Sequence, residues 1–197
     1  MQCEALVAQL IRGRTSGRSL RAIAATLERF GPEALGFAIL RDVRIVPLSK
    51  RRRYREASSA LRRLGVDVDA WPVPPAGLFV VEERTVYLRS TSPMTVAHEF
   101  GHALDCALGG GTYRSGYDAA IRTAFSAARH FVTPYAATGL DEYFAEAVRA
   151  YVGANDPSSC WPRATRARLR RLDPAMHDIV DGLFANGFAA TELKEAS

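Results

Sequence analysis

Cysteine is scarce in this sequence, and long apolar runs are absent. The cysteines are odd in number and no two have the CxxC spacing; they are Cys3, Cys106 and Cys160. This pattern argues against a disulfide framework and against a cysteine-based zinc knuckle. No apolar run approaches the roughly 20 residues that a membrane-spanning helix needs, so no membrane span is expected.

The amino terminus lacks the features of a secretory signal peptide. Residues 1–12 carry an early acid, Glu4, have no basic lead and contain only a short apolar stretch. Localisation therefore stays open, with the cytoplasm as the default expectation and a non-classical export route as the alternative. No motif encodes the oligomeric state, and a monomer is the default expectation.

In other respects the chain has an ordinary globular composition. It has 197 residues, of which 48% are hydrophobic and 24% charged, enough for one domain over residues 1–197. Strand patterns at 43–49, 77–83 and 85–90 lie among many helical ones, and the last two are expected to form a hairpin. Pro47 confines the first strand to an edge or an end. A small sheet among many helices is the α+β class.

The net charge is +5, and the excess is arginine, concentrated in residues 51–55, 62–63 and 163–171. Such clusters can bind nucleic acid or acidic partners, but they are more often solvated helix faces. Residues 16–31 also resemble the first helix of a resolvase-like helix-turn-helix, although no convincing recognition helix follows. A DNA-binding module in the basic amino-terminal part is therefore an alternative, and nucleic acid is not the expected partner.

Residues 98–102, His-Glu-Phe-Gly-His, form a pattern that can bind a metal. Residues four apart lie on one face of a helix, so His98 and His102 can hold a single ion. Glu99 is rotated by about 100° from His98 and can act on a neighbouring water as a base. The chain has only four histidines, which makes this spacing improbable by chance. The alternative is two partly buried histidines bonded to the backbone.

A catalytic zinc needs a third protein ligand. Neither remaining histidine has the HExxHxxGxxH spacing, so an acid on a second helix is expected. The segment 139–151 supplies Glu142 and Glu146, four apart on one face of a largely apolar helix. A zinc ion would satisfy Glu142, and a ligand imidazole N–H would satisfy Glu146. Asp141 is the competing candidate for the third ligand.

At these residues the sequence resembles a known group of enzymes. "HEFGHALD", followed some 30 residues later by "TPYAATGLDEYFAEAVRAY", is similar to the catalytic core of anthrax lethal factor and of the Pro-Pro endopeptidases, which are gluzincin-type zinc proteases. The resemblance covers roughly residues 80–155. It implies a zincin-like fold, with a small twisted, mostly antiparallel sheet, an edge strand beside the HExxH helix and a helical carboxy-terminal half. The expected parts are residues 1–75 (helices and a strand), 76–110 (sheet edge and HExxH helix) and 111–197 (helices with the third ligand).

The resemblance also implies a role for each site residue and an activity. One Zn2+ would be bound by His98, His102 and Glu142, Glu99 would be the base, Tyr135 the transition-state donor, and Glu146 the support of a ligand. On the residues alone, Tyr113, Tyr117 and Tyr143 compete with Tyr135. The implied activity is that of a zinc endopeptidase whose partner is a protein or peptide substrate. A secreted or toxin-like protease is one form that such an enzyme takes.

An extended peptide substrate needs an exposed strand edge to pair with. Strand 85–90 comes just before the HExxH helix and is the candidate for this edge. The substrate-binding residues would then be Thr85, Val86, Tyr87, Leu88, Arg89 and Ser90. The alternative for this segment is an ordinary internal strand, and the choice of cleavage site is not readable from the sequence.

Two further alternatives keep the HExxH pattern. A regulatory protease of the phage-repressor-cleaving type follows it with an ExxAxxFA-like helix, which "DEYFAEAVRA" matches less well. A fold that binds zinc without turnover is the other alternative, and the presence of both Glu99 and Tyr135 argues against it.

Overall fold

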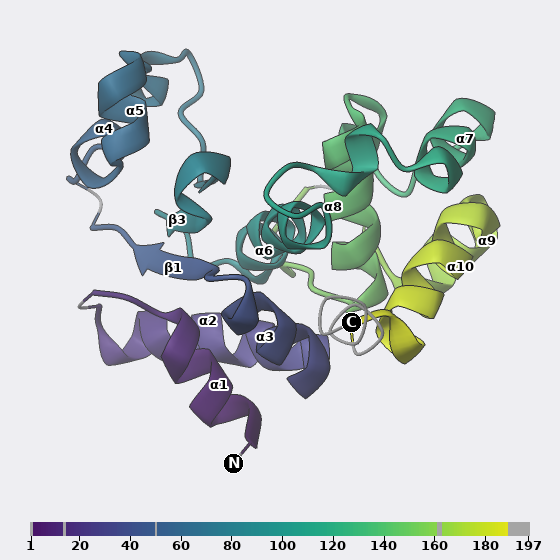
Figure 1. Cartoon of the computed structure of the whole chain (residues 1–197), viewed down its shortest axis with the longest axis horizontal. Helices are drawn as coiled ribbons and strands as arrows, with labels where there is room; N and C mark the ends of the chain where they lie inside the picture. Colours follow the sequence, from purple (N-terminus) through teal and green to yellow (C-terminus); the bar gives the residue numbers. More distant parts are fainter. Residues whose placement is uncertain (1, 14, 50, 161–162, 189–197) are drawn as a thin grey trace.

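The computed structural model describes residues 2–13, 15–49, 51–160 and 163–188. In these ranges many helices surround a small sheet, the α+β class predicted from the sequence (Figure 1). The helices are α1 (Gln2–Leu10), α2 (Gly17–Leu27), α3 (Gly31–Leu40), α4 (Tyr54–Ala57), α5 (Ser59–Leu64), α6 (Pro93–Leu108), α7 (Ala119–Ala127), α8 (Leu140–Tyr151), α9 (Arg166–Leu172) and α10 (Pro174–Gly182). The strands are β1 (Arg44–Pro47), β2 (Gly77–Val80) and β3 (Thr85–Leu88). None of the helices in the described ranges is long and apolar enough to cross a bilayer.

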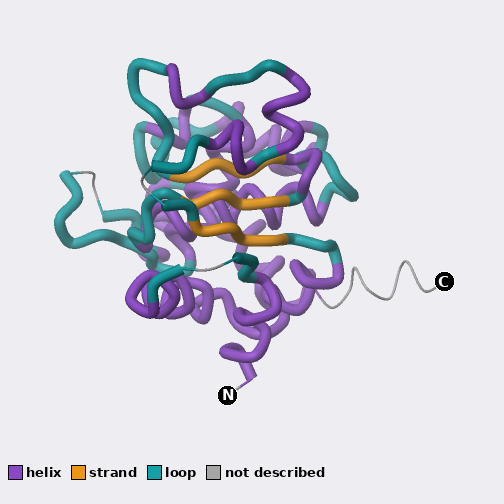
Figure 2. The backbone as a smooth tube through the Cα atoms, turned by 90° about the vertical axis from the view of Figure 1, so that its left-hand side faces the viewer, coloured by secondary structure: helices purple, strands orange, loops and turns teal. Residues whose placement is uncertain are grey.

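The three strands lie side by side in the order β1–β3–β2 (Figure 2). β2 and β3 pair antiparallel and are joined by the short 3-10 turn η3 (Val81–Glu83), which confirms the expected hairpin. β1 pairs with β3 in parallel, so the sheet is mixed. β1 lies at an edge and ends at Pro47, as the sequence predicted.

β3 is the central strand of the sheet, so the prediction that residues 85–90 form its edge is wrong. β1 is paired with one side of β3 and β2 with the other, and all four residues of β3 are buried. The physical reason is the parallel pairing of Arg44 with Thr85, which joins segments far apart in the chain and leaves no local sequence pattern. The edge strand beside α6 is β2.

Alternate residues of the strands serve two separate cores, because successive side chains point to opposite faces of a sheet. Phe79 and Val86 belong to the main core, which includes α6. Val80 and Tyr87 belong to a smaller cluster that includes buried residues of α4 and α5. The sheet therefore has α6 on one face and the α4–α5 unit on the other.

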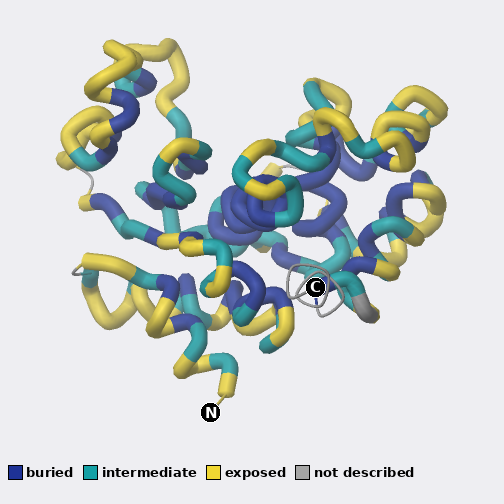
Figure 3. The backbone as a smooth tube through the Cα atoms, in the orientation of Figure 1, coloured by how far each residue is buried: buried dark blue, intermediate teal, exposed yellow. Residues whose placement is uncertain are grey.

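Helix α6 runs through the centre of the molecule, where Figure 3 shows it buried. Its residues from Val96 to Ala107 are buried except for His98. α2, α3 and α8 all pack against it. A Cβ added at Gly101 would lie 3.0 Å from the Cα of Ala145, so glycine permits the close approach of α8. This close approach brings side chains of α8 within reach of the HExxH residues.

Candidate metal centre

Two residues of α6 and one of α8 bring their donor atoms together. The Nε2 atoms of His98 and His102 are 3.1 Å apart. The Oε2 atom of Glu142 is 3.0 Å from His98 Nε2 and 3.4 Å from His102 Nε2. These three side chains form the group suited to hold a metal ion, and the competing candidate Asp141 does not belong to it.

The donor set fits a zinc ion by its spacing and by its unsatisfied oxygen. Ligand atoms at about 2.0–2.1 Å from a tetrahedral ion lie about 3.3 Å from one another. The three observed separations, from 3.0 to 3.4 Å, bracket that value. Glu142 Oε2 is buried and has no hydrogen-bond partner among the described residues. A buried carboxylate oxygen without a donor is costly, and a cation at this point would remove the cost.

Glu99 follows His98 on α6, and its buried side chain lies against β2. Burial raises the pKa of its carboxyl, and the positive charge that His98 and His102 can carry acts in the opposite direction. A Cβ at Gly77, the first residue of β2, would lie 2.6 Å from Glu99 Cγ. Only a glycine therefore lets the edge strand pass this close to Glu99, and the sequence analysis did not single out Gly77.

Tyr135 is the tyrosine whose hydroxyl reaches the donor set. It lies in the 3-10 turn η5 (Tyr135–Ala137), is 44% exposed, and donates to Glu142 Oε1 at 2.9 Å. Burial of the phenol, followed by the charge of Glu142, raises its pKa, so it remains a proton donor at neutral pH.

The other candidate tyrosines have different surroundings. The Tyr113 ring lies 5.6 Å from the ring of His102. Tyr117 is exposed. Tyr143 is buried and donates to Asp173 at 2.5 Å. Only Tyr135 thus combines exposure with a hydrogen bond to the donor set.

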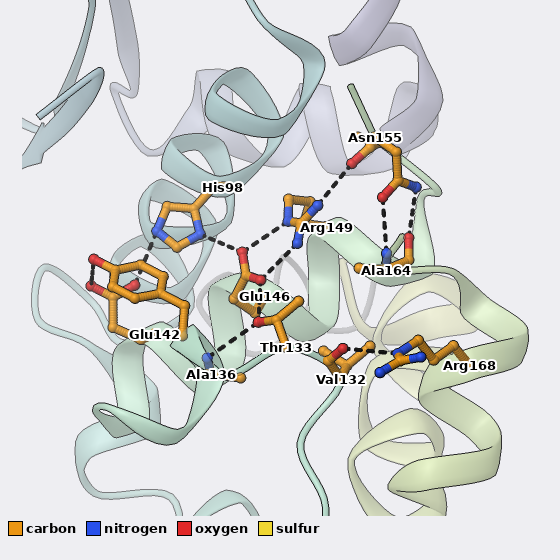
Figure 4. A network of polar contacts seen from close by, with 12 residues as sticks. His98, Val132, Thr133, Ala136, Glu142, Glu146, Arg149, Asn155, Ala164 and Arg168 are labelled. Carbon is orange, nitrogen blue, oxygen red and sulfur yellow. Dashed lines mark hydrogen bonds and ion pairs between the residues drawn. The ribbon is translucent and has the colours of Figure 1, made fainter. Parts of the chain in front are cut away.

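Glu146 supports His98 from behind, at the centre of a buried polar network (Figure 4). Its Oε1 atom is 3.0 Å from His98 Nδ1, and Arg149 donates to both of its oxygens at 2.8 and 2.7 Å. Thr133 donates to Oε2 at 2.5 Å. Burial opposes ionisation, but the bonds from His98 and Arg149 outweigh it and lower the pKa of Glu146 to about 2. An ionised Glu146 keeps a proton on Nδ1, which leaves Nε2 as the nitrogen that can bind a metal.

The two histidines have unequal surroundings. Burial lowers the pKa of His98, but the carboxylates of Glu142 and Glu146 beside it dominate and raise the pKa to about 10. The Nδ1 atom of His102 is buried and has no hydrogen-bond partner in the described part of the chain. Its ring orientation is set by packing, including the Tyr113 ring.

The sequence analysis missed Thr133 and Arg149. Arg149 lies three residues after Glu146 on the same helix, and this spacing could have indicated the pair. Thr133 belongs to an irregular segment between helices, where no periodicity singles out one residue.

The residues proposed from strand 85–90 to bind substrate are engaged elsewhere. Residues 85–88 are internal to the sheet. Arg89 forms an ion pair with Asp69 and its guanidinium lies 4.3 Å above the ring of Tyr54. Ser90 accepts a hydrogen bond from the N–H of Ser92 at the start of α6. None of the six therefore lies along the free edge of the sheet, so the exposed edge for which they were proposed as substrate-binding residues is not theirs.

A cleft of about 520 Å³ opens beside the donor set. One side, here called the polar wall, presents His98, Glu99 and Tyr135, with Glu146 and Arg149 behind them. The other side, called the apolar wall, is formed by Trp71 and residues 73–77, which include Val73. The cleft thus combines reactive groups with an apolar surface.

Two histidines on α6 and a glutamate on α8, beside a small sheet, are the arrangement of a zincin-like fold. A solved structure with this fold is the Pro-Pro endopeptidase PPEP-2 from Paenibacillus alvei. It matches this chain with a TM-score of 0.66 and 20% identity, over 90% of this chain and 99% of its own. The zincin-like fold expected from the sequence is thereby confirmed. No protein-family model matches the sequence. No curated protein matches it either.

Proposed function

We propose that this protein is a zinc-dependent endopeptidase that hydrolyses peptide bonds in an extended segment of a protein or peptide. The observation that carries the proposal is the convergence of Glu142 with His98 and His102, directly beside Glu99. The fold shared with a Pro-Pro endopeptidase supports it. A protein or peptide is the proposed partner.

Glu99 and Tyr135 of the polar wall each have a task in this reaction. A zinc ion in the donor set would supply a Lewis acid that polarises the scissile carbonyl and makes water easier to ionise. Glu99 takes the proton of the attacking water and later delivers it to the leaving amine. Its raised pKa suits both transfers. Tyr135 turns its hydroxyl from Glu142 to the developing oxyanion, where a hydrogen bond lowers the barrier.

The edge strand β2 is the proposed docking strand for the substrate backbone. One side of β2 pairs with β3, and the other is not paired with any strand in the described ranges. An extended peptide can add to such an edge through backbone hydrogen bonds. Gly77 carries no side chain that would separate this edge from Glu99. A bound peptide would then run between the polar and apolar walls.

The test combines metal analysis with a peptide-library digest of the wild type and of Glu99→Gln. We expect one zinc per chain in both proteins, and a loss of cleavage of about 10²–10⁴-fold in the variant, the range of general-base catalysis. Glu28→Gln, which changes an exposed glutamate in the same way, is the matched control and should retain wild-type cleavage. Cleavage by Glu99→Gln at the wild-type rate would contradict the proposal.

A further inference from the structure

A buried hydroxyl bonds the turn that carries Tyr135 to the polar wall. Thr133 is buried, and its Oγ1 atom makes two hydrogen bonds. It donates to Glu146 Oε2 at 2.5 Å and accepts from the backbone N–H of Ala136 at 3.3 Å. Ala136 is the middle residue of η5, directly after Tyr135. The hydroxyl therefore connects the turn to helix α8.

Glu146 is a fixed point for this connection. Arg149 binds both of its oxygens, is only 1% exposed, and also donates to the carbonyl of Ala154 at 3.2 Å. The same carboxylate lies 3.0 Å from Nδ1 of His98. Figure 4 shows His98, Glu146, Thr133 and Ala136 as one continuous chain of polar contacts. The carboxylate of Glu146 therefore contacts both His98, a proposed metal ligand, and Thr133, which bonds to the turn of Tyr135.

The side chain of Tyr135 has few contacts, one of which is its ring 5.4 Å from the ring of His98. It is 44% exposed, and its hydroxyl has Glu142 Oε1 as its hydrogen-bond partner among the described residues. Thr138 also bonds within the turn, because its Oγ1 donates to the carbonyl of Tyr135 at 2.7 Å. That bond shapes the turn but does not attach it to α8.

We infer that Thr133 is a positioning residue, which sets where the Tyr135 hydroxyl lies relative to the metal ligands. This inference rests on the proposed peptidase function. Without the Thr133 hydroxyl, η5 keeps its internal bonds but loses its attachment to Glu146. The phenol then spends less time where it can donate to the oxyanion, so the rate of the chemical step falls while substrate binding is retained.

The kinetic test uses the zinc-loaded protein and three substitutions. Thr133→Val removes the hydroxyl at nearly constant shape and should lower kcat about tenfold, the effect of losing one hydrogen bond, with KM changed less than about twofold. Thr133→Ser restores the hydroxyl and should recover most of kcat. Thr138→Val is the matched control, since it removes a hydroxyl from the same turn, and it should leave kcat within about twofold. An equal loss in Thr133→Val and Thr133→Ser overturns the inference.

A double-mutant cycle tests whether Thr133 acts through Tyr135. In a Tyr135→Phe background, Thr133→Val should cause no further loss of kcat beyond about twofold. If Thr133→Val costs the same tenfold in that background, Thr133 acts on some other group and the inference is wrong. Should Thr133→Val fail to give the wild-type circular dichroism spectrum, Thr133→Ala replaces it in the same cycle.

A spectroscopic readout separates this inference from the proposed function. In protein labelled with 3-fluorotyrosine, the ¹⁹F resonance of Tyr135 is assigned as the signal that Tyr135→Phe removes. Thr133→Val should shift this resonance, whereas Thr133→Ser and Thr138→Val should leave it in place. An unchanged resonance in Thr133→Val refutes the inference. A wild type that cuts no peptide refutes the proposed function, and the resonance still reports whether Thr133 positions Tyr135.

Discussion

The polar and apolar walls of the cleft are built in opposite ways. The polar wall consists of charged and hydrogen-bonding groups that are cross-linked through Glu146 and Arg149. The apolar wall exposes large hydrophobic side chains, with Trp71 53% and Val73 82% accessible to solvent. A side-chain hydrogen bond also reaches this wall: the hydroxyl of Tyr54 donates to the carbonyl of Pro75 at 2.8 Å. Rigid polar groups suit chemistry, and exposed apolar groups suit the choice of substrate.

A carboxylate accepts several hydrogen bonds in each of two regions: Glu146 in the polar wall, and Glu83 between α5 and the sheet. Glu146 accepts from Arg149 and Thr133 on the polar side. On the other side, Glu83 accepts from the Oγ of Ser59 at 2.6 Å, the N–H of Ala60 at 2.9 Å and the hydroxyl of Tyr87 at 2.8 Å. These bonds attach α5 to the sheet, and α4 and α5 precede the apolar wall in the chain. Removing parts of each wall should therefore have separable effects.

The largest effect should come from removing a proposed metal ligand beside the polar wall. Glu142→Ala removes one of three donors, so its affinity for zinc should fall by more than the roughly 10–100-fold that loss of a supporting residue costs. Competition with a chromogenic chelator measures this. Asp141→Ala, a neighbour on the same helix, should keep zinc. Loss of zinc in Asp141→Ala and retention in Glu142→Ala would mean that the third ligand is Asp141.

An intermediate effect should come from the apolar wall. Trp71→Ala removes an exposed apolar contact that is made equally before and during the reaction, so KM should rise about tenfold with kcat nearly unchanged. Steady-state kinetics on the best peptide of the library measures both constants. Tyr117→Ala, which truncates an exposed aromatic outside the cleft, is the control. A fall in kcat with constant KM would show that the apolar wall takes part in the chemistry.

The smallest effect should be on acid stability, through Glu83. Burial opposes its ionisation, but the hydrogen bonds from Ser59, Ala60 and Tyr87 lower its pKa from 4.5 to about 2. The carboxylate therefore stabilises the folded state above pH 4.5, and this contribution is lost as the pH falls toward 2. Glu83→Gln should lower the free energy of unfolding at pH 6 and lose this deficit near pH 2.

Urea denaturation of the metal-free protein at several pH values measures the Glu83 contribution without zinc release. Glu82→Gln changes the adjacent residue and is the control. If Glu83→Gln and the wild type differ by the same amount at pH 6 and near pH 2, the carboxylate charge does not contribute to stability.

The sequence predicted the polar wall far better than the apolar one. HExxH and the glutamates of residues 139–151 obey helical spacing, which is local, so the pattern indicated which side chains share a face. The hairpin of β2 and β3 was predicted for the same reason. The central position of β3 depends on its parallel pairing with β1, and the attachment of Thr133 to Glu146 joins a loop to a helix. Long-range contacts of this kind leave no periodicity in the sequence.

Phe100 and Gly101, the two central residues of the HExxH segment, carry no metal-binding group. They nevertheless set how α6 is placed against its neighbours. Phe100 is fully buried and anchors α6 in the core. Gly101 sets how near Ala145 can come. A bulkier residue at position 101 would leave His98, His102 and Glu142 unchanged. It would still push α8 away from α6 and so lengthen the distance from Glu142 to the two imidazoles. In this protein the two variable positions of the HExxH motif therefore help to set the distance between the histidines of α6 and Glu142 of α8.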